Sequence, residues 1–277
     1  MLAPRHDRVK AIVLAGNGTN CELEMAHACR TAGCDEVDIV HLSELLYGDK
    51  RLDDYHFLNL PGGFLDGDDL GAAKAQANRF RHARLEGGGE KLSEQLLRFI
   101  EAGKLVLGVC NGFQLMVKLG LLPNFAGKLT QETTLMSNDS GRFEDRWVAL
   151  RVNDGPCVFT RGLSTLYLPV RHGEGKFVPG DGVLPRMEAE RLIVLRYTRR
   201  GETQPTQEYP ANPNGSVAAV AGVCDRSGRL FGLMPHPEAF LHYTNHPRWT
   251  REKNLPEEGD GLAIFRNAAA FIRETLL

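Results

Sequence analysis

The chain has 277 residues, of which 42% are hydrophobic and 25% charged, and its formal net charge is −2. These values are typical of an ordinary globular protein and allow one large α/β domain or two small ones. They exclude the basic character of a nucleic-acid binder, and no apolar run reaches the ~20 residues that a membrane-spanning helix needs.

The first half of the chain alternates strand-like and helix-like segments. Short apolar runs, as in strands buried on both faces of a parallel sheet, cover residues 9–15, 37–41, 56–60 and 105–109. Thr19 and Glu22 have the spacing of a capping box, which predicts a helix from there to about Ala32. Further helices are predicted over residues 67–83, 91–102 and 111–119. This alternation predicts a mainly parallel, doubly wound sheet with helices on both faces.

The second half contains strand-like segments that are joined mostly by turns. They cover residues 147–152, 166–170, 192–197, 216–224 and 230–234, and we expect them to form an antiparallel or mixed extension of the same sheet. Asp260 is predicted to cap a final amphipathic helix whose apolar side carries Leu262, Phe265, Ala269 and Ile272. No internal repeat or flexible linker interrupts the chain, so we predict one domain over residues 1–277. Residues 1–8 lead straight into a strand, so we expect no signal peptide and a cytoplasmic protein.

The sharpest motif is the sequence LVLGVCNGFQ at residues 105–114. An apolar strand leads through G-x-C-x-G into a helix, which is the cysteine form of a nucleophile elbow. Gly108 and Gly112 allow strand and helix to approach closely, and Cys110 lies at the apex of the turn. The unpaired N–H groups at the start of the helix stabilise a thiolate and an oxyanion. We therefore predict that Cys110 is a nucleophile rather than a buried structural cysteine.

A cysteine nucleophile needs a base, and the base needs a group that orients it. His236 and Glu238 lie in the sequence MPHPE, directly after the strand-like residues 230–234. The two prolines stiffen this segment, and loops at the carboxyl ends of parallel strands are where α/β sheets place their sites. We predict that His236 is the base and Glu238 its partner.

A metal site is the alternative for this region, since His242 and His246 are four residues apart and lie close in sequence to Glu238. Pro247 and the polar surroundings favour a solvated loop instead. The six cysteines include no CxxC pair, which argues against a zinc ribbon or a thioredoxin-like motif. We expect no metal in this chain, and reduced, buried thiols other than Cys110.

Two glycine-containing loops complete the predicted site. The sequence LPGGF at residues 60–64 ends a strand, and the backbone N–H groups of Gly63 and Asn111 are candidate oxyanion donors. The sequence RHGEG at residues 171–175 is a polar loop in which His172 or Glu174 could contact the amino-acid end of a substrate. A plain surface turn is the alternative for each loop.

Taken together, these motifs resemble the glutaminase subunits of phosphoribosylformylglycinamidine synthases, which are class I, triad-type glutamine amidotransferases of purine biosynthesis. The resemblance covers residues 9–277 and is carried by GVCNGFQ, PGGF, HGEG, NPNGS at residues 212–216, and MPHPE. It implies a flavodoxin-like amidotransferase fold. It also implies hydrolysis of glutamine at Cys110 with His236 and Glu238, and a substrate site that includes Gly62, Phe64, Gln114, His172 and Glu174.

The resemblance also implies partners. Ammonia would pass through a tunnel to a synthetase subunit that amidates formylglycinamide ribonucleotide with ATP and magnesium, and the complex can include a small third subunit. No cofactor is expected in this chain. Residues 16–20, 67–72 and 140–148 are similar to loops of the long single-chain synthetases, and Gly71 and Ala72 stand where the usual small subunit has an Arg. The way in which this chain docks to its partner is therefore left open.

Three other functions stay open at this point. The chain could be a class I amidotransferase that serves another synthetase, a ThiJ-like cysteine hydrolase or chaperone, or a binding subunit without activity. A ThiJ-like protein would not explain the HPE segment, which is far from the elbow in sequence. The complete set of Cys110, His236 and Glu238 argues against the third.

Overall fold

The centre of the structure, a computed structural model that describes residues 8–87, 89–127 and 129–277, is a nine-stranded sheet. Its strand order is β2-β1-β3-β4-β11-β10-β9-β6-β7. The first five of these strands are parallel: β2 (Glu36–His41), β1 (Lys10–Ala15), β3 (Phe57–Leu60), β4 (Leu105–Val109) and β11 (Leu230–Leu233). The others continue the sheet antiparallel: β10 (Val220–Cys224), β9 (Ile193–Thr198), β6 (Glu144–Val152) and β7 (Thr165–His172).

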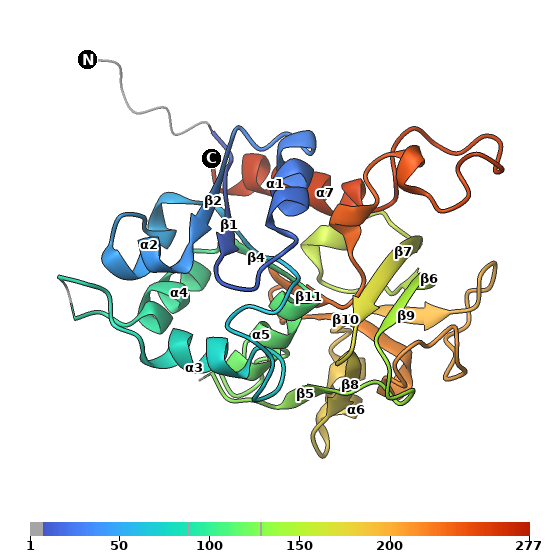
Figure 1. Cartoon of the computed structure of the whole chain (residues 1–277), viewed down its shortest axis with the longest axis horizontal. Helices are drawn as coiled ribbons and strands as arrows, with labels where there is room; N and C mark the ends of the chain where they lie inside the picture. Colours follow the sequence, from blue (N-terminus) through green and yellow to red (C-terminus); the bar gives the residue numbers. More distant parts are fainter. Residues whose placement is uncertain (1–7, 88, 128) are drawn as a thin grey trace.

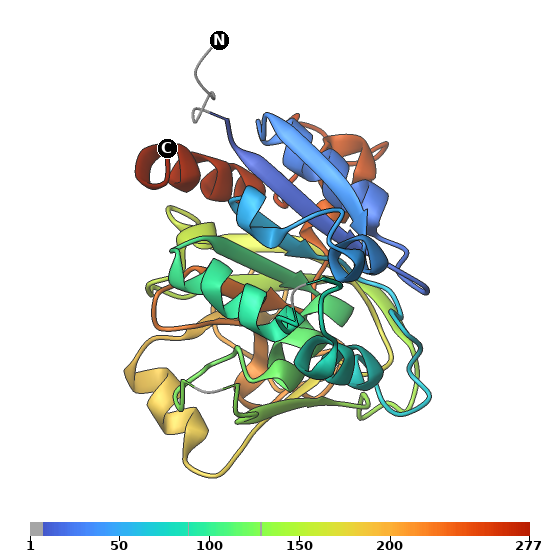
Figure 2. The same cartoon turned by 90° about the vertical axis from the view of Figure 1, so that its left-hand side faces the viewer.

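Helices cover both faces of the parallel part (Figures 1 and 2). On one face, α1 (Glu22–Thr31) packs beside α7 (Leu262–Thr275). On the other, α5 (Asn111–Leu119) contacts α3 (Lys74–His82), which contacts α4 (Leu92–Glu101). The predicted mainly parallel sheet with helices on both faces and an antiparallel extension is confirmed. No helix in the described part of the chain has the length and apolar character needed to cross a membrane.

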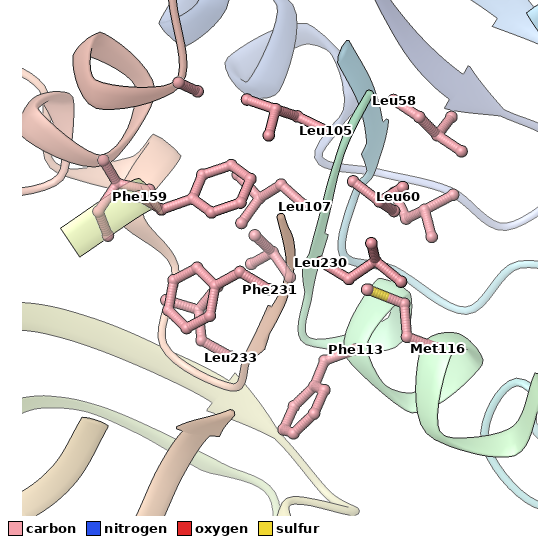
Figure 3. Packing of buried hydrophobic residues seen from close by; sticks show 14 of the residues in the cluster. Leu58, Leu60, Leu105, Leu107, Phe113, Met116, Phe159, Leu230, Phe231 and Leu233 are labelled. Atoms are coloured by element: carbon pink, nitrogen blue, oxygen red, sulfur yellow. The ribbon is translucent and has the colours of Figure 1, made fainter. Parts of the chain in front are cut away.

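The elbow helix α5 is fixed to the sheet by apolar side chains (Figure 3). Phe113 and Met116 are fully buried against β3, β4 and β11. Glycines make room for them: a Cβ atom on Gly108 would lie 2.5 Å from the Met116 sulfur, and one on Gly232 would lie 2.1 Å from the Phe113 ring. Burying such side chains contributes about 1.5–3 kcal/mol each. The end of β4 and the start of α5 are thus held rigidly where Cys110 joins them.

Three predicted helix boundaries are wrong. Thr19 does not cap α1, because it forms a β-bridge with Gly63 and the helix begins only at Glu22. The predicted helix 67–83 is shorter, since Gly67, Gly71 and Ala73 have positive φ and α3 begins at Lys74. Asp260 does not cap α7, because its carboxylate accepts a hydrogen bond from the backbone N–H of Tyr167 at 2.7 Å.

Some elements were not predicted or lie elsewhere. The predicted strand 216–224 begins only at Val220, because residues 217–219 form a 3-10 turn, η3 (Val217–Ala219). Two short helices were not predicted, α2 (Leu42–Tyr47) and α6 (Val183–Ala189). A small antiparallel sheet of β5 (Thr133–Met136) and β8 (Lys176–Pro179) was not predicted either. The other unpredicted elements are the 3-10 turns η1 (Leu52–Asp54), η2 (Val158–Thr160), η4 (Pro237–Ala239) and η5 (Tyr243–Asn245). Residues 1–7 of the predicted single domain lie outside the described residues.

Candidate active site

Cys110 occupies the turn between β4 and α5 in a strained backbone conformation, with φ 51° and ψ −104°. Such a conformation costs about 1–3 kcal/mol and persists only where the surroundings impose it. Here they do: a Cβ atom on Gly112 would lie 1.9 Å from the carbonyl oxygen of Leu60, so strand and helix meet with no room for a side chain. The Cys110 thiol lies 3.5 Å from the carbonyl oxygen of Arg171. The geometry is that of a nucleophile elbow, as the glycine spacing predicts.

The predicted oxyanion loop lies beside the elbow because β3 is the parallel neighbour of β4. Gly63 has φ 137°, and a Cβ atom there would lie within 3.0 Å of the backbone of Gly18, Thr19 and Asn20. The Gly62 carbonyl accepts hydrogen bonds from the backbone of residues 20 and 21, which pins the turn to the loop before α1. The turn is therefore a packed part of the site and not a free surface loop.

His236, in the cavity wall, and Glu238 form a buried pair. Nδ1 of His236 lies 2.5 Å from Oε1 of Glu238, and both side chains are almost fully buried. The His236 backbone donates a hydrogen bond to the Pro169 carbonyl at 2.8 Å, which ties the segment to β7. Burial alone would disfavour a charged imidazole, but the Glu238 carboxylate and the thiols of Cys110 and Cys21 raise the pKa of His236 well above its usual value. Among the described residues Nε2 has no partner within hydrogen-bond geometry, so the two thiols act on the ring from a longer distance.

Seven of the ten predicted site residues line one cavity of about 250 Å³. They are Gly63, Phe64, Cys110, Gln114, His172, Glu174 and His236. Gly62, Asn111 and Glu238 are not among the lining residues, but each lies close to one that is: Gly62 and Glu238 to His236, and Asn111 to Gln114. Six further residues line the cavity and were not predicted: Asn20, Cys21, Asp68, Phe143, Arg171 and Gly173.

Hydrogen bonds connect the predicted substrate residues with one another. The Asn111 side chain accepts a hydrogen bond from the Leu65 N–H and donates one to Gln114 at 3.0 Å. Gln114 donates to the backbone carbonyl of Glu174 at 2.6 Å, and the Glu174 carboxylate accepts from the Ala72 N–H at 3.2 Å. The loops after β3, β4 and β7 are therefore tied together around the cavity.

His172 differs from the prediction. It is the last residue of β7, not part of a loop, and its ring is buried between Asn138 and Asn214, at 3.0 Å from Nδ1 and 3.4 Å from Nε2. Since the Asn214 amide donates to Nε2, the ring is neutral and donates from Nδ1 to Asn138. Burial, aided by the charge of His236, lowers the pKa of His172 to about 4. The ring thus supports the cavity floor as an uncharged group.

Asp68 is a cavity residue that sequence reasoning missed. It was placed in a helix, whereas it lies in the loop that precedes α3. Its Oδ1 atom is buried and has no hydrogen-bond partner in the part of the chain that the structure describes. Burial, together with the negative charge of Glu174, raises the pKa of Asp68. A carboxylate oxygen without a partner beside a cavity can bind a cationic group of a substrate. The only available signal was the Gly67-Asp68 turn after PGGF.

The alternative metal site of Glu238, His242 and His246 does not form. Glu238 contacts His236, and the half-buried His242 ring forms a hydrogen bond with the Thr244 hydroxyl. His246 packs among Trp147, Tyr167 and Phe240. The described residues contain a different group, in which Cys21, His236 and Glu238 offer ligand atoms within 4.8 Å of one another.

Comparisons with known proteins agree with this geometry. Residues 8–272 match the CobB/CobQ-like glutamine amidotransferase domain. The phosphoribosylformylglycinamidine synthase subunit PurQ of Dehalococcoides mccartyi is 46% identical over 96% of this chain and 99% of its own length. That of Methanococcus maripaludis is 39% identical over 96% and 98%. Among solved structures, PurLQS from Thermotoga maritima matches with a TM-score of 0.70 and 30% identity, over 96% of this chain and 99% of that one.

Proposed function

The chain belongs to the CobB/CobQ-like glutamine amidotransferase family, and we propose that it is the glutaminase subunit of a phosphoribosylformylglycinamidine synthase in purine biosynthesis. One observation supports this chemistry. Cys110, in its strained turn, lines the same cavity as His236, and Nδ1 of His236 lies 2.5 Å from the Glu238 carboxylate. A nucleophile, a base and an orienting carboxylate are the three groups that cysteine-based amide hydrolysis needs.

In the first half of the proposed reaction, the Cys110 thiolate attacks the side-chain amide carbon of glutamine. Glu238 stabilises the protonated form of His236, which is the proton donor of this half-reaction. The backbone N–H groups of Gly63 and Asn111 bind the oxyanion; Asn111 is the first residue of α5, so its N–H has no partner within the helix. His236 then gives its proton to the leaving nitrogen, and ammonia departs with a thioester left on Cys110.

In the second half, neutral His236 takes a proton from water, and the resulting hydroxide attacks the thioester carbon. The C–S bond breaks, glutamate leaves and the thiolate is restored while His236 is again protonated. Because Glu238 holds Nδ1, Nε2 is the nitrogen that exchanges protons in both halves. One histidine therefore acts as acid and then as base.

The cavity also accounts for recognition of the amino-acid end of glutamine. The half-buried Asp68 carboxylate, whose Oδ1 atom has no partner among the described residues, is the acceptor for the α-ammonium group. Gly62, Phe64 and Gln114 shape the rest of the site, while His172 and Glu174 hold the loops that form it.

The proposed partner is an ATP-dependent synthetase subunit, which receives the ammonia and holds ATP and magnesium, and a small third subunit can complete the complex. The relatives support this proposal, since they are named as subunits of the synthase. No cofactor is assigned to this chain.

The test is reconstitution with a synthetase subunit of this pathway. Cys110→Ala should abolish synthesis from glutamine and leave synthesis from free ammonia intact, because the two reactions occur on different chains. A covalent glutamine analogue should label Cys110 in the wild type. Equal loss of the glutamine-dependent and ammonia-dependent reactions, or a label on another residue, would contradict the proposal.

A further inference from the structure

Arg171 is a cation in the cavity wall that the proposed reaction does not use. It precedes His172 at the end of β7, it lines the cavity, and its backbone carbonyl lies 3.5 Å from the Cys110 thiol. The side chain is half-buried, and its Nε and Nη2 atoms are buried without a hydrogen-bond partner among the described residues. Buried polar groups are normally hydrogen-bonded, so a guanidinium left unpaired beside a cavity indicates that its partner is a ligand.

The neighbouring strand offers this guanidinium no partner. Asp145 of β6 is the cross-strand neighbour of Arg171, but Asp145 is exposed, and no ion pair joins the two within the described residues. Arg146, the next residue of β6, does have a partner, since it pairs with Glu144. The Arg171 guanidinium is therefore not held by an ion pair of the fold, and its terminal bonds can turn toward a ligand in the cavity.

The charges around the cavity show which ligand this guanidinium fits. The lining contains two carboxylates, those of Asp68 and Glu174, and Arg171 is the only arginine or lysine among the lining residues that the structure describes. The two histidines of the lining do not replace it, because His172 is neutral and His236 is paired with a carboxylate. An anionic group that enters the cavity is repelled by the two carboxylates and attracted by the guanidinium.

We propose that Arg171 binds the α-carboxylate of glutamine and is a specificity-determining residue of this site. The inference rests on the proposed function, which makes glutamine the substrate. A guanidinium can donate two parallel hydrogen bonds to one carboxylate, which is the pairing that arginine favours. With Asp68 at the α-ammonium group, each charged group of the amino-acid end has a partner of opposite sign. The site thereby selects an α-amino acid over a side-chain amide that lacks the carboxylate.

Arg171 acts on the part of glutamine that does not react. Its backbone lies beside the nucleophile, while its long side chain can reach the end of the substrate away from the reacting amide. The contact to the α-carboxylate is the same before and during attack by Cys110. Its loss should therefore raise KM for glutamine and change kcat little.

The test compares glutamine with L-glutaminamide, in which a neutral amide replaces the α-carboxylate. Ammonia release from both is measured in the complex reconstituted with the synthetase subunit. The wild type should prefer glutamine in kcat/KM by roughly 10–100-fold, the contribution of a hydrogen bond to a charged group. Arg171→Gln should raise KM for glutamine by about this factor, leave KM for L-glutaminamide nearly unchanged, and so lose the preference. Arg171→Lys keeps the charge but not the two parallel donors, and should retain part of the preference.

Arg142→Gln is the matched control. It removes the same charge from an exposed position next to the cavity residue Phe143, and Arg142 itself does not line the cavity. This variant should keep the wild-type preference for glutamine. Loss of the preference in Arg142→Gln as well would mean that overall charge, and not a contact from Arg171, attracts the carboxylate.

If Arg171→Gln kept the preference for glutamine, another group would bind the carboxylate and the inference would be wrong. Weaker binding of the synthetase subunit at unchanged KM would also overturn it, in favour of a docking role. The preference of the wild type needs no variant, so equal kcat/KM for the two amides would overturn the inference even if substitutions at Arg171 impair folding. A wild-type complex that does not hydrolyse glutamine at all is a different result, because it contradicts the proposed function itself.

Discussion

The carbonyl oxygen of Leu60 would lie 1.9 Å from a Cβ atom on Gly112, which is closer than any side chain can approach. Leu60 ends β3 just before the Gly62-Gly63 turn, and Gly112 is the second residue of α5. The proposed oxyanion loop and the elbow at Cys110 are therefore in direct contact. The distance between the two segments can be this short only because Gly112 has no Cβ atom.

Gly112→Ala should destabilise the protein by about 1–3 kcal/mol or more, because the added methyl group meets backbone that cannot move away cheaply. Helix propensity alone predicts the opposite sign, a gain of up to about 1 kcal/mol. Urea unfolding of the two proteins measures the difference. Gly173→Ala is the control, since a Cβ atom there has its nearest neighbour at 3.9 Å. A Gly112→Ala protein at least as stable as the wild type would show that the contact relaxes freely.

Glu238→Gln should lower kcat by roughly 10²–10⁴-fold while the fold is kept, because His236 loses the group that orients it. Since the Glu238 carboxylate raises the pKa of His236, its removal lets the ring lose its proton at a lower pH. The alkaline limb of the pH–kcat profile should move toward lower pH. Steady-state kinetics from pH 6 to pH 10 would measure both effects.

Glu252→Gln is the matched control for charge, because Glu252 pairs with Arg200 at the surface, outside the cavity. It should leave both kcat and the alkaline limb in place. If the alkaline limb of Glu238→Gln lay at the same pH as that of the wild type, the Glu238 carboxylate would not raise the pKa of His236. That result would contradict the interpretation of the 2.5 Å contact.

Signals close together in the chain were sufficient to predict the geometry around Cys110 and the contact between His236 and Glu238. The strand, Gly108, Cys110, Gly112 and the helix are contiguous, and the elbow follows from them. His236 and Glu238 are two residues apart in a proline-stiffened segment, so their contact needs little from the rest of the fold. The parallel sheet likewise follows from the alternation of apolar runs and helices.

Predictions failed where a distant partner overrides a local preference. Thr19 has the spacing of a cap but forms an isolated β-bridge with Gly63, outside the strands of the sheet. Asp260 precedes a helix but binds the backbone of Tyr167, which lies 93 residues away in the chain. Cys21 and Asp68 reach the cavity only because the loops after β1 and β3 fold against each other, and no local pattern predicts that approach.

Asp68→Asn should raise KM for glutamine with little change in kcat. The carboxylate is proposed to bind the α-ammonium group, and a hydrogen bond to a charged group contributes about 1.5–3 kcal/mol, or roughly 10–100-fold in KM. Asp69→Asn, at the exposed neighbouring residue, is the control and should leave KM unchanged. A fall in kcat at constant KM would instead assign Asp68 to the chemical step.

His172 should make the protein less stable in acid. Burial lowers its pKa to about 4, whereas the unfolded chain has the ordinary value of about 6.5. As pH falls below about 6.5, His172 takes up a proton in the unfolded state but stays neutral in the folded state. Its contribution to the free energy of unfolding is therefore fully present above about pH 6.5 and decreases as pH falls to about 4. Between pH 7 and pH 5 this residue should cost about 2 kcal/mol of unfolding free energy. Urea unfolding at the two pH values measures the loss.

His172→Gln should reduce this acid-dependent loss by about 2 kcal/mol, even if the variant is less stable at both pH values. Asn214→Ala is a control that lowers stability without removing the titrating group. It removes the contact to Nε2 of His172 but keeps the imidazole buried, and burial is the main cause of its lowered pKa. That variant should be destabilised yet retain most of the acid-dependent loss. The same loss in His172→Gln as in the wild type would mean that another group carries the pH dependence.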